Sequence, residues 1–186
     1  MRLFIAIEIP ETVKAELNEL QVELRRAGAE VGWTKPENIH LTLRFLGETG
    51  EDKLDDLKRI CWQTAAEFQP FKLQTKEIGY FPSFRQPRVL WAGLGGEIET
   101  AKELQKRLEE RLTSIGYDQQ DTPFKPHLTI GRVKSGKNMK PLVAAADMYP
   151  LPEVTFDVGE IVLMKSDLHP AGARYTALSR FKLGVV

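Results

Sequence analysis

Residues 40–46 read HLTLRFL and residues 127–133 read HLTIGRV, so the same His-Leu-Thr-aliphatic core occurs twice. In both copies polar and apolar residues alternate, which is typical of a half-buried β-strand. The chain has only three histidines, and two of them open these stretches, 87 residues apart (127 − 40). The repeated motif therefore predicts two equivalent strands in one fold.

Similar elements precede the two copies. In the first half, apolar alternation or helical spacing predicts a strand at 3–9, a helix at 11–27 and the motif strand at 40–46. In the second half, the same patterns predict a strand at 88–94, a helix at 98–115 and the motif strand at 127–133. The common spacing indicates duplicated β-α-β units that pack about a pseudo-two-fold axis. Equivalent points then face one another, which brings His40 and His127 into one cleft. The halves, roughly 1–80 and 88–183, are expected to be lobes of a single domain, 1–186.

The rest of each half completes an α+β pattern. The predictions are a helix at 54–68, a strand at 71–81, a short helix at 142–146 and closing strands at 154–166 and 174–183, with a basic loop at 134–140.

The composition excludes several classes of protein. Hydrophobic residues make up 42% and charged residues 28% of the 186, as in ordinary globular proteins. Lys plus Arg and Asp plus Glu both number 26, so binding to nucleic acid would need a local basic patch. The lone Cys61 is expected in the core, and no apolar run reaches membrane-spanning length. We expect a cytoplasmic monomer with no membrane contact.

The two motifs suit proton transfer at phosphorus. Residues i and i+2 of a strand share a face, so His40 points with Thr42 and His127 with Thr129. Two imidazoles can serve as a general acid and a general base in an in-line displacement. Threonine hydroxyls can donate hydrogen bonds to phosphate oxygens. This scheme requires no metal and no cofactor.

Residues beside the motifs are candidates for substrate binding. Arg44 continues the face of His40 and Thr42, although a solvated strand arginine explains it equally well. Arg132 would point away unless Gly131 hosts a bulge that turns it toward the cleft. Phe45 and Arg132 could then stack on a base and clamp a phosphate.

Simpler interpretations apply to other residues. A metal site needs further ligands, and only His169 and Cys61 remain among the soft donors. His169 lies in a predicted turn between the last two strands and is expected to be exposed. Trp33 and Trp91 are expected to pack in the core or at its rim.

The stretches WTKPENIHLTLRFLGE, PFKPHLTIGRV and LMKSDLHPAGARYTAL together resemble the 2H phosphoesterase superfamily. Within it, the chain is most similar to the RNA 2′,3′-cyclic phosphodiesterases, also described as LigT-type 2′-5′ RNA ligases. The resemblance implies a bilobal α+β fold with antiparallel sheets lining a V-shaped cleft. It also implies metal-independent opening of a terminal 2′,3′-cyclic phosphate to a 2′-phosphate.

The resemblance further assigns roles by motif position. His40 would be the proton donor and His127 the proton acceptor, while Thr42, Thr129 and Arg132 would bind phosphate. The partners would be RNA ends that carry a cyclic phosphate, such as tRNA halves, or nucleotides, and 2′-5′ ligation could run in reverse. Two alternatives stay open: action on small cyclic nucleotides or an ADP-ribose cyclic phosphate, and a non-catalytic module that binds RNA ends.

Overall fold

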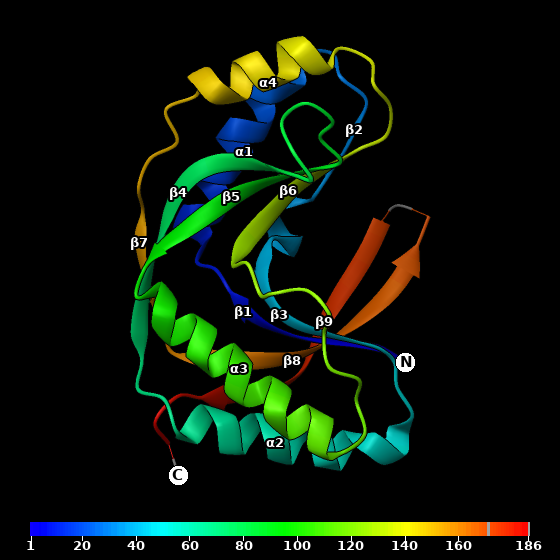
Figure 1. Ribbon diagram of the computed structural model, residues 1–186, viewed down its shortest axis with the longest axis vertical. Helices are drawn as coiled ribbons and strands as arrows, with labels where there is room; N and C mark the ends of the chain where they lie inside the picture. The colour runs from blue at the N-terminus through cyan, green and yellow to red at the C-terminus, as the bar shows by residue number, and fades with distance from the viewer. Residues whose placement is uncertain (171, 186) are drawn as a thin grey trace.

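The computed structural model describes residues 1–170 and 172–185, which form one curved antiparallel sheet with four α-helices packed on it (Figure 1). The elements follow in this order: β1 (Arg2–Glu8), α1 (Glu11–Arg25), β2 (Val31–Trp33), η1 (Pro36–Asn38), β3 (His40–Glu48), η2 (Glu51–Lys53), α2 (Leu54–Ala66), β4 (Phe71–Phe81), β5 (Val89–Gly96), α3 (Ile98–Ser114), β6 (His127–Val133), α4 (Met139–Met148), β7 (Thr155–Val158), β8 (Glu160–His169) and β9 (Gly172–Lys182). The predicted α+β class is confirmed.

The strand order places the two motif strands at the centre of the sheet. The order is β7-β4-β5-β6-β3-β1-β8-β9, with β2 paired to β6 alone. The pairing between β3 and β6 joins Leu41 to Leu128, which are themselves 87 residues apart (128 − 41). Antiparallel strands that pair at equivalent residues are related by a two-fold axis through that pair. The pseudo-dyad predicted from the repeat therefore passes between the motifs.

The two halves of the sequence exchange strands across this axis. β4, which ends the first half, pairs with β5 of the second half. β8, near the end of the second half, pairs with β1 of the first half. The division into two lobes, roughly 1–80 and 88–183, stays a prediction.

Two predicted boundaries were wrong. The stretch 154–166 is not one strand, because it breaks at Gly159 into β7 and β8, which lie near opposite ends of the strand order. The basic stretch 134–140 is not a loop throughout, because its last two residues, Met139 and Lys140, begin α4. β2 was not predicted, since three residues are too few to show a periodicity.

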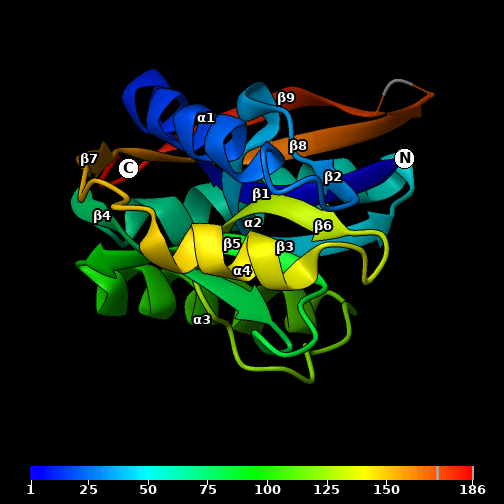
Figure 2. The same cartoon turned by 90° about the horizontal axis from the view of Figure 1, so that it is seen from above.

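Packing in the core fixes which side chains of the motif strands point inward and which point to the opposite face. The helices pack in two pairs, α1 with α4 and α2 with α3 (Figures 1 and 2). Their leucines are buried in the core that they form with the sheet. Leu41, Leu43, Leu128 and Ile130 are at most 1% exposed in this core. Because strand residues alternate, this anchoring turns the intervening polar residues to the opposite, concave face. Cys61 is fully buried on α2, as predicted, and burial raises its pKa to about 12.

Candidate active site

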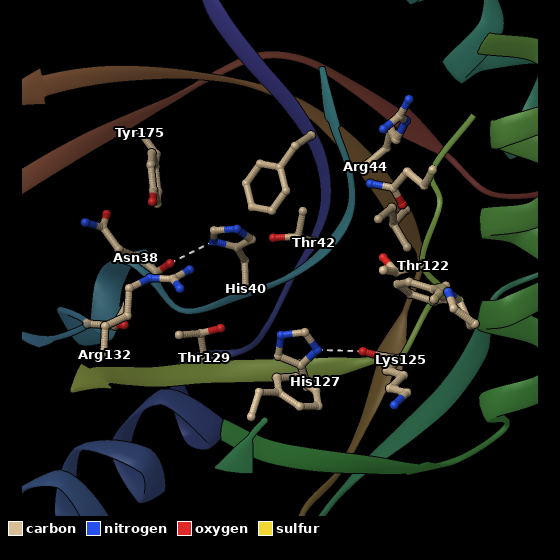
Figure 3. Close-up of a pocket in the computed structure, with 17 residues that line it drawn as sticks. Asn38, His40, Thr42, Arg44, Thr122, Lys125, His127, Thr129, Arg132 and Tyr175 are labelled. Carbon is tan, nitrogen blue, oxygen red and sulfur yellow. Dashed lines mark hydrogen bonds between the residues drawn. The ribbon is translucent and has the colours of Figure 1, made fainter. Parts of the chain in front are cut away.

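Both His-x-Thr motifs line one cavity on the concave face of the sheet. Its volume is about 570 Å³, and His40, Thr42, His127 and Thr129 all contribute to its wall (Figure 3). Extending the antiparallel register from Leu41 and Leu128 sets each histidine opposite the threonine of the other motif. The motifs therefore supply one site together, as the pseudo-dyad predicts.

The two imidazoles are held in the same way. Nδ1 of His40 lies 2.7 Å from the carbonyl oxygen of Asn38, and Nδ1 of His127 lies 2.5 Å from that of Lys125. A carbonyl can only accept, so each Nδ1 carries a hydrogen and donates it. Nε2 of each ring is left as the position that exchanges a proton with a ligand.

Aromatic side chains fix the planes of the two rings. Phe4 stacks on His40 at 4.8 Å between centroids, and Tyr175 meets the same ring edge-on at 5.3 Å. Phe81 meets His127 edge-on at 5.0 Å. These contacts and the Nδ1 hydrogen bonds restrict each imidazole to one orientation, which is a requirement for directed proton transfer.

Irregularities in the strands widen the set of residues that reach the cavity. The register of β5 against β6 shifts between Leu90 and Trp91, which leaves Ile130 without a partner. Beyond this bulge Gly131 is buried and Arg132 is exposed, so Arg132 lines the cavity. A Cβ on Gly131 would lie 2.7 Å from Cγ1 of Val31, so only glycine fits beneath β2.

The first motif has a comparable irregularity. The pairing of β3 with β1 also shifts, and both Arg44 and Phe45 line the cavity. Phe45 is 59% exposed at the rim, 87 residues before Arg132. An apolar ring and a guanidinium thus occupy equivalent places on the two sides of the site.

A family model for LigT-like phosphoesterases matches residues 7–91 and 96–175. The chain belongs to the LigT-like 2H phosphoesterase family. Its relatives include proteins named RNA 2′,3′-cyclic phosphodiesterase from Methanothermobacter thermautotrophicus and Methanocaldococcus jannaschii. These are 34% and 35% identical, over 98% and 97% of this chain and 99% and 100% of their own lengths. The resemblance inferred from the two motifs is confirmed.

Solved structures of the family have the same fold. A structure from Thermus thermophilus superposes with a TM-score of 0.82 at 31% identity, covering 99% of this chain and 98% of the other. Apo LigT of E. coli gives a TM-score of 0.79 at 26% identity, with coverages of 98% and 96%. A further E. coli LigT structure, described as complexed with 3′-AMP, gives 0.78 at 25% identity, with coverages of 98% and 97%.

Charged neighbours distinguish the two histidines of this family member. Burial lowers the pKa of His40 below its ordinary value of 6.5, while the Asn38 hydrogen bond and the Glu8 carboxylate act in the opposite direction. Burial also lowers the pKa of His127; the Lys125 hydrogen bond opposes this, but the Arg132 cation adds to the lowering. The neighbouring charges alone thus favour the protonated form of His40 and disfavour that of His127, while burial lowers both pKa values.

Arg44 is occupied by the protein itself. Its Nε lies 3.1 Å from Oε2 of Glu109, with the two side chains 11% and 12% exposed. This geometry makes an ion pair but not an aligned hydrogen bond. Arg44 also donates to the carbonyl of Asp118, and Glu109 accepts the backbone N–H of Gln120 at 2.9 Å. Arg44 thus links the cavity wall to α3. The sequence had suggested that Arg44 either faces solvent or contacts substrate, and neither interpretation included the ion pair with Glu109.

Several residues of the site escaped prediction. The carbonyls of Asn38 and Lys125 could have been found from the repeat, because they too are 87 residues apart (125 − 38). Phe81, Tyr175 and the wall at 122–124 come from elements outside the repeated unit, and no local pattern points to them. His169 is exposed, as predicted, but it ends strand β8 and does not lie in the turn. Trp91 packs on Phe81 at 5.0 Å, as predicted.

Two further features bear on cofactor and membrane. Within residues 1–170 and 172–185, no three His, Cys, Asp or Glu side chains gather where they could hold a metal ion. Among the same residues, no helix combines the length and apolar character needed to span a membrane.

Proposed function

We propose that this chain hydrolyses 2′,3′-cyclic phosphates at RNA ends to 2′-phosphates, with the two histidines exchanging protons with the reacting oxygens. The observation that carries the proposal is the matched pair of imidazoles. Each is locked through Nδ1–H to the carbonyl two residues earlier, and both line one cavity with two threonine hydroxyls. Relatives named RNA 2′,3′-cyclic phosphodiesterase supply the substrate class.

The proposed reaction is an in-line displacement at phosphorus. Nε2 of neutral His127 takes a proton from water as its oxygen attacks the phosphorus. The bond from phosphorus to O3′ breaks on the opposite side, and Nε2–H of His40 gives its proton to O3′. The products are a 2′-phosphate and a free 3′-hydroxyl. Each proton transfer is worth ~10²–10⁴-fold in rate.

The assignment of donor and acceptor is supported by the neighbouring charges. The Glu8 carboxylate favours the protonated form of His40, whereas the Arg132 cation disfavours that of His127. Thr42 and Thr129 would donate to the non-bridging oxygens, and Arg132 would neutralise their charge. A metal ion has no part in this scheme.

The same chemistry allows a ligation reaction. If the 5′-hydroxyl of a second RNA replaces water at His127, attack gives a 2′-5′ phosphodiester. The E. coli LigT structure with 3′-AMP supports a site that accepts a nucleotide. Action on small cyclic nucleotides uses identical steps and differs only in what lies beyond the terminal ribose.

Turnover of an RNA oligomer ending in a 2′,3′-cyclic phosphate, with excess chelator present, tests the proposal. We expect undiminished hydrolysis with a 2′-phosphate as the product, identified by its phosphorus NMR signal. A 3′-phosphate product, or loss of turnover in chelator, would contradict the proposed reaction. Parallel assays with mononucleoside 2′,3′-cyclic phosphates and an ADP-ribose cyclic phosphate compare the alternative substrates. Binding without turnover of any of them would favour the non-catalytic alternative.

A further inference from the structure

A second hollow, here called the basic groove, lies between the β4–β5 connection and the start of α4. Its volume is about 910 Å³, and it is lined by residues 85–88, 133–136 and 138–141. Four of these are cationic, namely Arg85, Arg88, Lys134 and Lys140, and none is acidic. The whole chain has a net charge of zero, so the groove concentrates positive charge that the composition does not reveal.

The four cations are not neutralised by neighbouring carboxylates. All four side chains are exposed, and within the described ranges 1–170 and 172–185 no carboxylate oxygen lies within 4.0 Å of any of them. The adjacent Lys137 does lie near an acid, 3.9 Å from Glu30, but it is not among the lining residues. Unpaired surface cations can bind phosphates by releasing the counterions of a polyanion.

The groove and the active-site cavity are lined by successive residues at the end of β6. Arg132 belongs to the cavity, and Lys134, two residues on, shares its face of the strand. Gly32 of β2 pairs with Arg132, so a Cβ added to Gly32 would point to the same face as the Arg132 side chain. That Cβ would lie 3.2 Å from Cε of Lys134, which places the Lys134 side chain on this face too. From His127 to Lys134 the strand rises roughly 20 Å, long enough for a few nucleotides of single strand.

The β4–β5 connection adds an aromatic surface. Phe84 is 59% exposed, and the guanidinium of Arg85 lies 5.7 Å from its ring centroid. Exposed rings beside a positively charged path are typical of sites that bind single-stranded nucleic acid, because bases stack on the rings. Figure 1 shows this connection beside the turn that follows β6.

The equivalent stretch of the first half has the opposite charge. Residues 134–140 read KSGKNMK, and residues 47–53, which lie 87 positions earlier, read GETGEDK. The first half therefore has two glutamates, an aspartate and one lysine in this stretch, where the second half has three lysines and no acid. A polyanion that approaches the cleft would be attracted more strongly along β6 than along β3.

We propose that the basic groove binds the phosphodiester backbone of the RNA that precedes the cyclic end. This inference rests on the proposed function, since it names where the rest of that substrate lies. It makes the preferred substrate an oligoribonucleotide with several phosphates upstream of its terminal ribose. The terminal cyclic phosphate alone would not engage the groove.

The test compares the parent with the quadruple variant Arg85→Ala, Arg88→Ala, Lys134→Ala and Lys140→Ala. A matched control removes four cations elsewhere, from α2, α3 and the turn before α2: Lys53→Ala, Lys58→Ala, Lys102→Ala and Lys106→Ala. Anisotropy of a labelled ten-residue RNA with a 3′-phosphate reports binding without requiring turnover. Hydrolysis of a mononucleoside cyclic phosphate is measured beside it.

The groove variant should bind the RNA at least tenfold more weakly at low salt, while the control variant binds like the parent. The slope of log affinity against log salt should fall by roughly three, because each lost contact to a single strand contributes about 0.7. Mononucleotide hydrolysis should change less than twofold in both variants. Equal RNA affinity in parent and groove variant, or equal losses in the groove and control variants, would overturn the inference. Failure of the parent to hydrolyse an RNA oligomer with a 2′,3′-cyclic end would contradict the proposed function and leave the binding result to decide the groove.

Discussion

The surroundings of His40 and of His127 repeat one backbone design with different charges. Both rings give Nδ1–H to the carbonyl two residues earlier, and both rest on aromatic side chains. Glu8 lies near His40, whereas Arg132 lies near His127. In the proposed reaction, duplication supplies two equivalent proton-transfer positions, and the charge differences between the halves separate their roles.

Removal of either histidine should have the largest effect. His40→Ala and His127→Ala should each lower kcat for a 2′,3′-cyclic nucleotide by ~10²–10⁴-fold, because each removes one proton transfer from the rate-limiting displacement. Steady-state kinetics measure the loss, and His169→Ala, which removes an exposed histidine, serves as the control. Parent-like rates in either cleft variant would mean that the two halves do not act as a pair.

The threonines should follow. Thr42→Val and Thr129→Val keep the shape of the side chain and remove the donor, so each should lower kcat by about 10²–10³-fold. Similar losses in the two variants would support symmetric contacts to phosphate. A loss confined to KM would instead indicate that the hydroxyls bind the ground state and the transition state equally.

Arg44 and Gly131 occupy equivalent places, 87 residues apart, but only Arg44 has a side chain that pairs with a buried carboxylate, that of Glu109. The stability of the fold should therefore depend on Arg44. Arg44→Ala leaves Glu109 buried without its cation and should lower the free energy of unfolding by about 3–5 kcal/mol. Chemical denaturation measures this. Arg59→Ala breaks an exposed pair with Asp56 and should cost about 0–1 kcal/mol. If the two variants lose the same stability, the Arg44 pair is a surface interaction rather than a buried tie.

The smallest effect should come from the pH dependence. Both histidine pKa values are lowered from 6.5, so kcat/KM of the free enzyme should peak below pH 6.5. Loss of the donor proton from His40 sets the alkaline limb, and protonation of His127 sets the acidic limb. Because Glu8 favours protonated His40, Glu8→Gln should move the alkaline limb to lower pH. Arg132→Gln should move the acidic limb to higher pH, whatever its effect on binding.

The same pKa shifts make a prediction for stability. Both groups are more easily protonated when unfolded, so the free energy of unfolding should fall as pH drops below 6.5 toward their folded pKa values. If the free energy of unfolding falls less steeply with pH in His40→Gln and His127→Gln than in the parent, these two histidines cause the pH dependence.

The motif strands and their partnership could be predicted because they depend on local rules. Alternation fixed the faces of β3 and β6, and the repeat at 87 residues implied an axis that the Leu41–Leu128 pairing confirms. The break at Gly159 could not be predicted, since the strand-like pattern of 154–166 does not say which part of the sheet each piece joins. The pairing of Arg44 with Glu109 on α3 and the contact of Tyr175 with His40 are also tertiary, because they link segments that sequence patterns treat separately.

The most direct test of the central claim, that His40 gives a proton and His127 takes one, is a change of leaving group. A nucleoside phosphodiester of 4-nitrophenol needs no proton donor, because its leaving group departs as a stable anion. On this substrate His40→Ala should hydrolyse within about tenfold of the parent, while His127→Ala should keep its ~10²–10⁴-fold deficit. Recovery of His127→Ala instead, or equal deficits in both variants, would contradict the account.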